Sequence, residues 1–576
     1  MKPGVVGWRA ILAAIALGVA YCPRAAAEFP INTYTTGNQS YPAIAMSGSG
    51  EFVVVWQHAL GLGADVLGQR FDATGSPVGS EFAVNTFTTD RQILPAVAVD
   101  GTGKFVVVWE GQDDRDGDQF GIFARRYDGA GVPLGEFQVN VYTTGRQVFP
   151  RVAAGPGGFV VVWAGTDQDG SSYGIFGRRY DGAGAALGGE FQVNTYTTGF
   201  QFWPDVAVDG AGNFVVVWAM GSETTELRIV GQRYDSGGVA LGGEFQVSTD
   251  TALANEVPHV AMQGAGGFLI VWRITRSVSD RDVMARRYDG AGVPAGAEFR
   301  VNTYTRGRQQ SATVAVDGAG GFVVAWGSDD DQDGSAGRVI GQRYDAAGLP
   351  LGGEFQLNTH TFSDQRAPTV GADSAGNFVV AWESWYQDGP SLDVFGQRNK
   401  PDRIVRGHSM FVRNPGDEDD RMLVATGSEK PTDIGSSIDG DPTAAGATLR
   451  VITSGGTATD QTYVLDASGW RRLGSTGFGY AGPTGGDGDP VRRVVIKRRP
   501  GGVALFRAIL DGGLGSQSLD AVPPDPGDDV RLVLQFDNGG GTYCVTLGAG
   551  FGSTESVDTA QAWKLSGATA EAACPP

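Results

Sequence analysis

The sequence has few of the residues and motifs from which enzyme sites are usually built. Its 576 residues include three cysteines and four histidines. It contains no HExxH zinc motif, GxSxG nucleophile elbow, Walker phosphate loop or CxxC pair. Acidic residues are so numerous that no pair of carboxylates stands out as the acid and base of a glycosidase. These absences favour a non-catalytic protein over an enzyme.

The chain also lacks an excess of positive charge. It carries 44 Lys and Arg against 64 Asp and Glu, for a formal net charge of −20 and a pI near 4.6. Nucleic acids and anionic membranes need a basic surface, so neither is expected as a partner. After the first residues, no apolar run approaches the roughly 18 residues that a membrane span needs. The composition suits a soluble monomer that requires no cofactor.

The first 27 residues have the layout of a secretory signal peptide. Lys2 and Arg9 precede or adjoin an apolar run from Ala10 to Tyr21, and small residues follow at 25–27. We therefore expect secretion to an extracellular or periplasmic location. Cleavage leaves Cys544 and Cys574, which we predict to form a disulfide. The bridge would close a loop of 574 − 544 = 30 residues, worth about 3 to 4 kcal/mol.

Glycine, by contrast, is abundant, with 90 residues, and it punctuates an internal repeat. A Glu-Phe pair recurs every 53 to 56 residues, and an apolar run ending in tryptophan recurs with it. The glutamates are Glu28, Glu81, Glu136, Glu190, Glu244, Glu298 and Glu354, and the tryptophans are Trp56, Trp109, Trp163, Trp218, Trp272, Trp326 and Trp382. Both series have seven members.

Each repeat contains four β-rich pieces of five to nine residues bounded by Gly, Asp or Pro. Four antiparallel strands form one propeller blade, so the sequence predicts an all-β fold with a seven-bladed propeller over residues 28–399. We name the four strands of a blade a to d, from the axis outward. Strand a contains VAVD, strand b FVVVW, strand c IVGQRYD and strand d EFQVNTYT. The chain then starts with a d strand and ends the seventh copy with a c strand. We expect the first strand to complete the last blade.

The FVVVW and GQRYD repeat of about 54 residues resembles one found in uncharacterised secreted bacterial proteins. The strand order is similar to that of WD-repeat propellers, although the Gly-His and Trp-Asp signatures are missing. The resemblance covers residues 28–399 and implies the fold without an activity.

A linker is expected at residues 400–403, followed by a second domain over residues 404–576. Short β-like runs such as ATLRVIT, QTYVLD and VRLVLQF predict a β-sandwich-like domain there. The run LFRAIL is ambiguous between a strand and a short helix.

Residues present in every blade are predicted to build the blades. These include the tryptophans, the Glu of each Glu-Phe pair, and the c-strand arginines Arg70, Arg126, Arg179, Arg233, Arg287, Arg343 and Arg398. We expect each arginine to stack on an aromatic ring or to pair with a carboxylate at a blade junction.

The d–a and b–c connections share one rim, and the a–b and c–d connections share the other. The second rim consists of uniform Asp-Gly turns, whereas the first varies and is the better candidate for a binding face. Its aromatic residues, which could bind carbohydrate or an extracellular protein, are Tyr41, Phe149, Phe200, Phe202, Trp203, Trp385 and Tyr386. The alternative is that the residues directly before proline only pack at the blade entrance.

Three loops on the variable rim carry acidic residues at alternate positions, as calcium loops do. The candidate ligands are Asp114, Asp116, Asp118, Asp167, Asp169, Ser171, Asp331, Asp333 and Ser335. An EF-hand needs Glu at the twelfth position, where these loops have Arg125, Arg178 and Gln342. Plain hairpin turns are therefore favoured over calcium sites.

The sequence thus predicts a secreted, non-catalytic binding or surface-interaction protein. An extracellular polysaccharide hydrolase or lyase and a calcium-assisted adhesion protein are the alternatives.

Overall fold

The computed structural model describes most of the repeat region and the strands of the C-terminal region. The described residues are 28–112, 114–118, 120–221, 227–250, 252–277, 279–329, 337–351, 354–399, 403–413, 422–428, 442–445, 447–454, 459–473, 477–481, 491–498, 504–511, 529–536, 542–548, 554–559 and 562–566. The expected signal peptide and Cys574 lie outside these residues, so both remain predictions.

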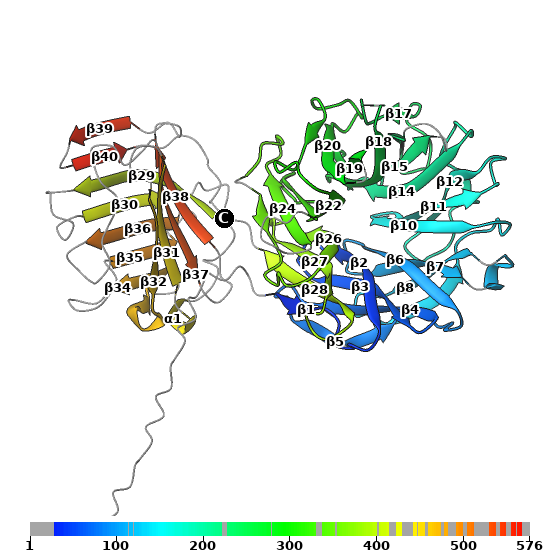
Figure 1. Ribbon diagram of the computed structural model, residues 1–576, viewed down its shortest axis with the longest axis horizontal. Coiled ribbons are helices and arrows are strands. Elements are labelled where there is room, and N and C mark those ends of the chain that lie inside the picture. The colour runs from blue at the N-terminus through cyan, green and yellow to red at the C-terminus, as the bar shows by residue number, and fades with distance from the viewer. Residues whose placement is uncertain are drawn as a thin grey trace, which may run out of the picture.

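The repeat region is a β-propeller, as predicted (Figure 1). The inner a strands, which surround the axis, are β2 (Asn38–Met46), β6 (Arg91–Val99), β10 (Gln147–Gly155), β14 (Phe200–Val208), β18 (Ala254–Met262), β22 (Gln309–Val316) and β26 (Gln365–Ala372). The b strands, which contain the recurring tryptophans, are β3 (Phe52–Leu60), β7 (Phe105–Gln112), β11 (Gly158–Thr166), β15 (Phe214–Gly221), β19 (Phe268–Ser277), β23 (Phe322–Ser328) and β27 (Phe378–Trp385). A short 3-10 helix, η1 (Asp114–Asp116), follows β7.

The two outer positions of each blade are also filled as expected. The c strands are β4 (Gly63–Phe71), β8 (Gly121–Tyr127), β12 (Tyr173–Tyr180), β16 (Arg228–Tyr234), β20 (Asp280–Tyr288), β24 (Arg338–Tyr344) and β28 (Leu392–Asn399). The d strands are β5 (Pro77–Ala83), β9 (Pro133–Gln138), β13 (Phe191–Gln192), β17 (Phe245–Gln246), β21 (Phe299–Arg300), β25 (Phe355–Gln356) and β1 (Phe29–Pro30). We number blades 1 to 7 by their a strands, from β2 to β26.

The first strand closes the ring, which confirms the expectation from the repeat phase. β1 pairs with β28 in antiparallel register, with Phe29 opposite Gly396 and Pro30 opposite Phe395. The fourth strand of blade 7 therefore comes from the start of the repeat region.

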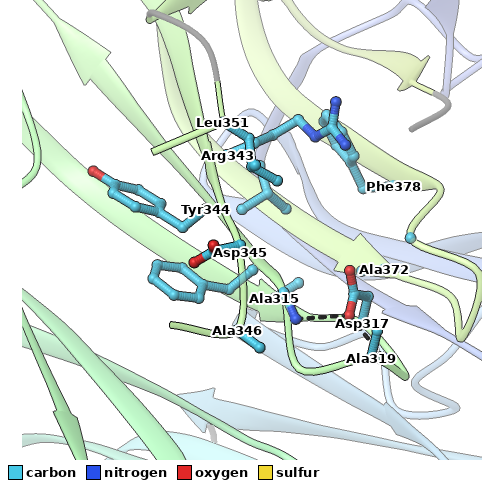
Figure 2. A pocket seen from close by; sticks show the side chains of 14 residues that line it. Ala315, Asp317, Ala319, Arg343, Tyr344, Asp345, Ala346, Leu351, Ala372 and Phe378 are labelled. Atoms are coloured by element: carbon cyan, nitrogen blue, oxygen red, sulfur yellow. Dashed lines mark hydrogen bonds between the residues drawn. The ribbon is translucent and has the colours of Figure 1, made fainter. Parts of the chain in front are cut away.

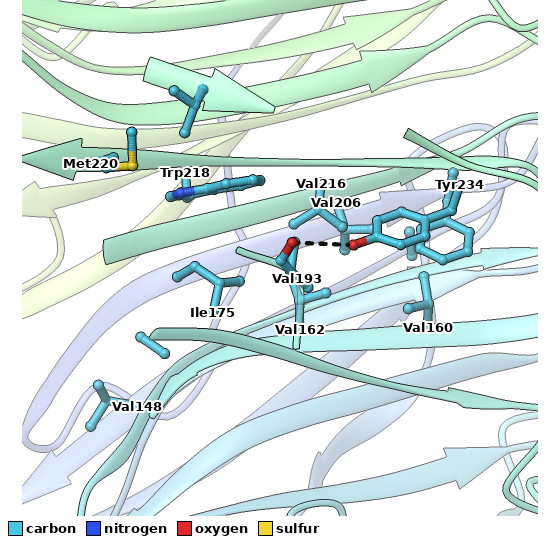
Figure 3. Packing of buried hydrophobic residues seen from close by; sticks show 14 residues of the cluster. Val148, Val160, Val162, Ile175, Val193, Val206, Val216, Trp218, Met220 and Tyr234 are labelled. Carbon is cyan, nitrogen blue, oxygen red and sulfur yellow. Dashed lines mark hydrogen bonds between the residues drawn. The ribbon is translucent and has the colours of Figure 1, made fainter. Parts of the chain in front are cut away.

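Apolar cores lie between neighbouring blades. The FVVVW runs are buried on both faces because each blade is packed between two others, so their hydrophobicity is continuous rather than alternating. Figure 3 shows the core between blades 3 and 4, where Val162, Ile175 and Trp218 meet. Tyr234 of blade 4 donates its hydroxyl to the Val193 carbonyl of blade 3 at 3.5 Å.

Most d strands are shorter than the predicted EFQVNTYT because of the asparagine within this piece, which is buried. In blade 1 the Asn85 Oδ1 accepts the Val66 backbone N–H at 2.7 Å, and Asn85 Nδ2 donates to Asp65 Oδ1 at 2.7 Å. A side chain thus takes the place of the backbone ladder, and the strand ends there. Six blades have Asn at this position, and blade 4 has Ser248.

The recurring glutamates and arginines join neighbouring blades. Glu136 accepts the Thr86 N–H of the preceding blade at 2.7 Å, and Glu28 accepts the Thr359 N–H across the ring closure. Arg70 donates to the Gly129 carbonyl at 2.9 Å, in the c–d turn of the next blade. For five of the seven arginines the prediction of a ring or carboxylate partner was wrong, because Arg70, Arg126, Arg179, Arg233 and Arg287 bind turn carbonyls.

The C-terminal region is also built from β-strands. They are β29 (Arg403–Arg413), β30 (Met422–Ser428), β31 (Ala447–Ser454), β32 (Thr459–Leu465), β33 (Trp470–Arg472), β34 (Gly477–Ala481), β35 (Val491–Arg498), β36 (Ala504–Asp511), β37 (Asp529–Phe536), β38 (Thr542–Gly548), β39 (Thr554–Thr559) and β40 (Ala562–Ser566), with the short helices α1 (Pro442–Ala445) and η4 (Ala467–Gly469). The run LFRAIL is a strand, because β36 pairs with β30 on one side and β35 on the other. The strands are joined in one hydrogen-bonded network that includes a parallel pair, β29 and β38.

Candidate functional site

The aromatic residues predicted on the variable rim lie closer to the axis than expected. Tyr41, Phe149, Phe200, Phe202 and Trp203 belong to the inner strands β2, β10 and β14, not to the d–a connections. Trp385 ends β27 and Tyr386 follows it. We call the d–a/b–c ends of the seven inner strands the inner rim.

Each inner strand has a β-bulge at this rim. Tyr41, Phe149 and Trp203 have φ of 51°, 56° and 50°, and Val257 has φ of 50°. The same left-handed conformation occurs at the equivalent positions Leu94, Ser311 and Ala367. Pairing with the b strand shifts register there in every blade. A bulge bends the strand and re-aims its side chains, so these residues are presented by a rigid element.

Five aromatic side chains gather at the inner rim of blades 3 and 4. Phe202 is at the centre, with ring centroids 4.8 Å from Phe149, 4.7 Å from Tyr173 and 5.2 Å from Trp203. Phe200 lies 6.4 Å from Tyr173, and the backbones of these two residues pair in parallel. All five are half-buried. We call Phe149, Tyr173, Phe200, Phe202 and Trp203 the blade 3–4 aromatic cluster; Tyr173 was not predicted.

A polar trio lies just beyond the bulges of three consecutive inner strands. Asp205 Oδ1 lies 3.9 Å from Arg151 Nε, and Asp205 Oδ2 lies 3.4 Å from His259 Nδ1. Asp205 Oδ2 also accepts the Val260 N–H at 2.8 Å. Burial lowers the pKa of Arg151, and the Asp205 carboxylate opposes this shift. Arg151 and Asp205 come two residues after Phe149 and Trp203 on β10 and β14, and the trio can donate and accept hydrogen bonds there.

A sequence signal for this trio existed. The trio occupies the second position after the left-handed residue of the bulge, directly after a proline or alanine. In the seven inner strands this position is Ala43, Ala96, Arg151, Asp205, His259, Thr313 and Thr369. The neighbouring positions are nearly constant between repeats. Variation at one position of a repeated strand marks a side chain that the blade itself does not need.

A second group of residues lies at the inner rim of blades 7 and 1. Arg366 Nε lies 2.9 Å from Glu383 Oε2, and the Tyr41 N–H donates to Glu383 Oε1 at 2.7 Å. The Arg366 guanidinium lies 5.8 Å from the Trp385 ring centroid, and the Trp385 and Tyr386 centroids are 5.7 Å apart. Burial raises the pKa of Glu383, while the Tyr41 N–H and Arg366 oppose the shift. Tyr41 is 52% exposed and Tyr386 is 55% exposed.

The seven predicted aromatic residues therefore separate into two groups. The blade 3–4 aromatic cluster contains four of them, and the blade 7–1 group contains Tyr41, Trp385 and Tyr386. The alternative of packing applies in part, because Phe149 and Trp203 contact neighbouring cores whereas Tyr41 is exposed. Ligand binding by any of them remains a prediction.

The acidic loops make contacts of their own. Asn140 Nδ2 donates to Asp116 Oδ2 at 3.3 Å, and Asn194 Nδ2 donates to Asp169 Oδ2 at 3.0 Å. Asp65, Asp282 and Asp393 accept from the equivalent asparagines of blades without such a loop. These two aspartates therefore have a structural role.

The remaining calcium candidates are less informative. Asp118 accepts the Gly145 N–H at 2.7 Å, and Asp167 adopts a left-handed φ of 61°. Ser171 donates its backbone N–H to Asp169, and Asp114 begins η1. Asp331, Asp333 and Ser335 lie outside the described residues. Within the described part of the chain, no cluster of three or more His, Cys, Asp or Glu side chains is arranged to hold a metal.

A cavity of about 240 Å³ lies on the opposite rim, between blades 6 and 7 (Figure 2). It is lined by turn residues such as Asp317 and Asp345 and by strand residues such as Arg343. The equivalent place between blades 2 and 3 measures only about 30 Å³, and its lining includes Gly182 of the blade 3 c–d turn. The blade 7 c strand ends at Asn399, so no corresponding turn is described there.

The fold and the inner rim define a β-propeller protein, and comparisons add no closer identity. No family model matches the chain, and no curated protein matches it. Similar solved structures include a Dyadobacter fermentans protein of unknown function, with 12% identity and a TM-score of 0.42 over 66% of this chain and 98% of that one. An ulvan lyase has 9% identity and a TM-score of 0.41, over 64% and 95% of the two chains. An α-L-arabinofuranosidase from Fusarium graminearum has 10% identity and a TM-score of 0.38, over 65% and 97%.

Similarities at this level support no inference about activity. Any inference about function must therefore be drawn from the residues of the inner rim. None of the helices in the described segments has the length and apolar character to cross a membrane.

Proposed function

We propose that this chain is a secreted, non-catalytic binding protein that takes carbohydrate at the inner rim of the propeller. The observation that carries the proposal is that the blade 3–4 aromatic cluster and the Arg151–Asp205–His259 trio share the inner strands β10 and β14. Aromatic faces stack on the apolar faces of sugar rings, and a carboxylate with neighbouring cations can bind sugar hydroxyls. The two parts of the site thus match the two kinds of surface that a sugar presents.

The placement of the cluster supports this proposal over a purely structural role. Each blade already has a complete apolar core between its strands and those of its neighbour. In blades 5 and 6 the positions of the bulged aromatics are held by Val257 and Ser311 without loss of the blade. Phe149, Tyr173, Phe202 and Trp203 pack against these cores, but blades 5 and 6 form without an aromatic residue at the bulge. A blade can therefore be built without these aromatic side chains.

The test is a glycan screen of the mature chain, followed by calorimetric titration of the glycan that binds. We expect Trp203→Ala and Tyr173→Ala to weaken binding by about tenfold or more, which is the effect of losing an aromatic contact worth about 1.4 kcal/mol. Leu187→Ala is the matched control, because Leu187 is 50% exposed on the opposite rim. Binding that is unchanged in both rim variants, or the binding of no glycan at all, would reject the proposal.

A second candidate is an extracellular polysaccharide hydrolase or lyase, which the Asp205–His259 contact favours. A histidine beside a carboxylate can accept or donate a proton during bond cleavage. Release of new reducing ends or of unsaturated products from a polysaccharide panel, abolished by His259→Gln, would replace the binding proposal with this one.

A further inference from the structure

The two aromatic groups of the inner rim lie on opposite sides of the ring axis. The blade 3–4 aromatic cluster is carried by β10, β12 and β14, and the blade 7–1 group by β26, β27 and β2. Figure 1 shows β2 and β26 across the axis from β14. One blade separates the groups along one arc and two along the other. Packed sheets lie about 10 Å apart, so the spacing between neighbouring blades sets the width of the ring. Positions half a ring apart are then separated by roughly 20 Å.

Polar side chains occupy the longer arc between them. On blade 5, Glu256 Oε2 lies 2.8 Å from Arg273 Nη2 and accepts the Thr275 hydroxyl at 2.8 Å. On blade 6, Arg308 Nε lies 3.2 Å from Asp329 Oδ2, and Arg308 is about half exposed. This arc offers donors and acceptors to a ligand that extends from one aromatic group to the other.

Three arginines of the inner rim are paired with carboxylates. Arg273 pairs with Glu256, Arg308 with Asp329, and Arg366 with Glu383. The chain as a whole carries a net charge of −20. A polyanionic ligand would have to displace these carboxylates and approach against the field of the whole protein, so a neutral ligand fits better.

From these observations we infer that the ligand is a neutral polysaccharide chain that crosses the inner rim, and that the blade 7–1 group is its second subsite. This inference rests on the proposed function and extends it to the size and charge of the ligand. Contacts at two linked subsites make the second contact intramolecular, so affinity rises once one chain reaches both. A single sugar or a disaccharide cannot cover a span of roughly 20 Å between half-ring positions.

The experiment measures how affinity depends on chain length. The probes are cello-, xylo- and manno-oligosaccharides from disaccharide to hexasaccharide, with oligogalacturonates of the same lengths as acidic probes. We expect at least a tenfold fall in Kd between disaccharide and hexasaccharide in one neutral series. Tyr386→Ala and Tyr41→Ala should remove most of this gain.

These variants are suited to the test because both side chains are more than half exposed, so their removal leaves no buried cavity. Leu187→Ala again serves as the control and should keep the full gain. Equal affinity for short and long neutral chains would overturn the inference while leaving the proposed function intact. Binding of the acidic series alone would overturn it as well. Binding of no oligosaccharide would count against the proposed function itself.

Discussion

Closure of the ring by the N-terminal strand can be tested at Asn32. This side chain is 2% exposed and joins β1 to β28. Its Oδ1 accepts the Val394 N–H at 2.6 Å, and its Nδ2 donates to Asp393 Oδ1 at 2.9 Å and to the Tyr34 carbonyl at 3.2 Å. Asn32→Ala leaves the Val394 N–H and the Asp393 carboxylate buried without these partners. At about 1 to 3 kcal/mol for each buried unpaired group, the propeller loses about 2 to 6 kcal/mol.

The assay is urea denaturation combined with amide hydrogen exchange. The matched control is Asn85→Ala, which removes the same contacts from blade 1, where all four strands are continuous in the chain. Both variants should lose similar stability. Only Asn32→Ala should speed exchange along β28, because the d strand of this blade, β1, is not joined to β28 by a turn and can detach locally. A loss below about 0.5 kcal/mol, within the range of ordinary surface substitutions, would refute this reasoning.

Three further predictions concern single residues or ions. Burial raises the pKa of Glu110 above its ordinary 4.5. The native state therefore holds the proton more tightly than the unfolded state does, and the free energy of unfolding should fall as pH rises above 4.5. Glu110→Gln should flatten this fall in denaturation measured from acidic to neutral pH, and an unchanged pH dependence would contradict it. Trp163→Phe should lower the free energy of unfolding by about 1 to 3 kcal/mol more than Trp218→Phe does. The reason is that Trp163 Nε1 donates to Gln147 at 3.1 Å, whereas Trp218 Nε1 has no hydrogen-bond partner. Equal losses in urea denaturation would argue against this difference. The melting temperature should be the same in millimolar calcium and in chelator; a site filled at 100 times its Kd would add about 2.7 kcal/mol and raise it.

The repeat made the architecture readable from the sequence, but it did not reveal the local geometry. The spacing of the tryptophans predicted the blades, and the repeat phase predicted that β1 would pair with β28. The length of the d strands was wrong because Asn85 and its equivalents bind the c strand through a side chain, which resembles a strand residue in a sequence pattern. The bulges were missed because left-handed backbone is expected at glycine, whereas here it occurs at residues such as Val257. Their aromatic side chains were therefore assigned to loops.

The position just after the bulge shows how such a fold can acquire a site. Its backbone is held by the register shift and by the neighbouring strand in every blade, so the side chain there is free to change. Three blades use this freedom for Arg151, Asp205 and His259, while Ala43 and Ala96 occupy it elsewhere. The contacts within the trio need adjacent blades, because Asp205 reaches Arg151 on one side and His259 on the other. A double variant at Arg151 and His259 should therefore differ from the sum of the single variants, since both side chains share the Asp205 carboxylate. Strict additivity in stability and in glycan affinity would mean that the three residues act independently.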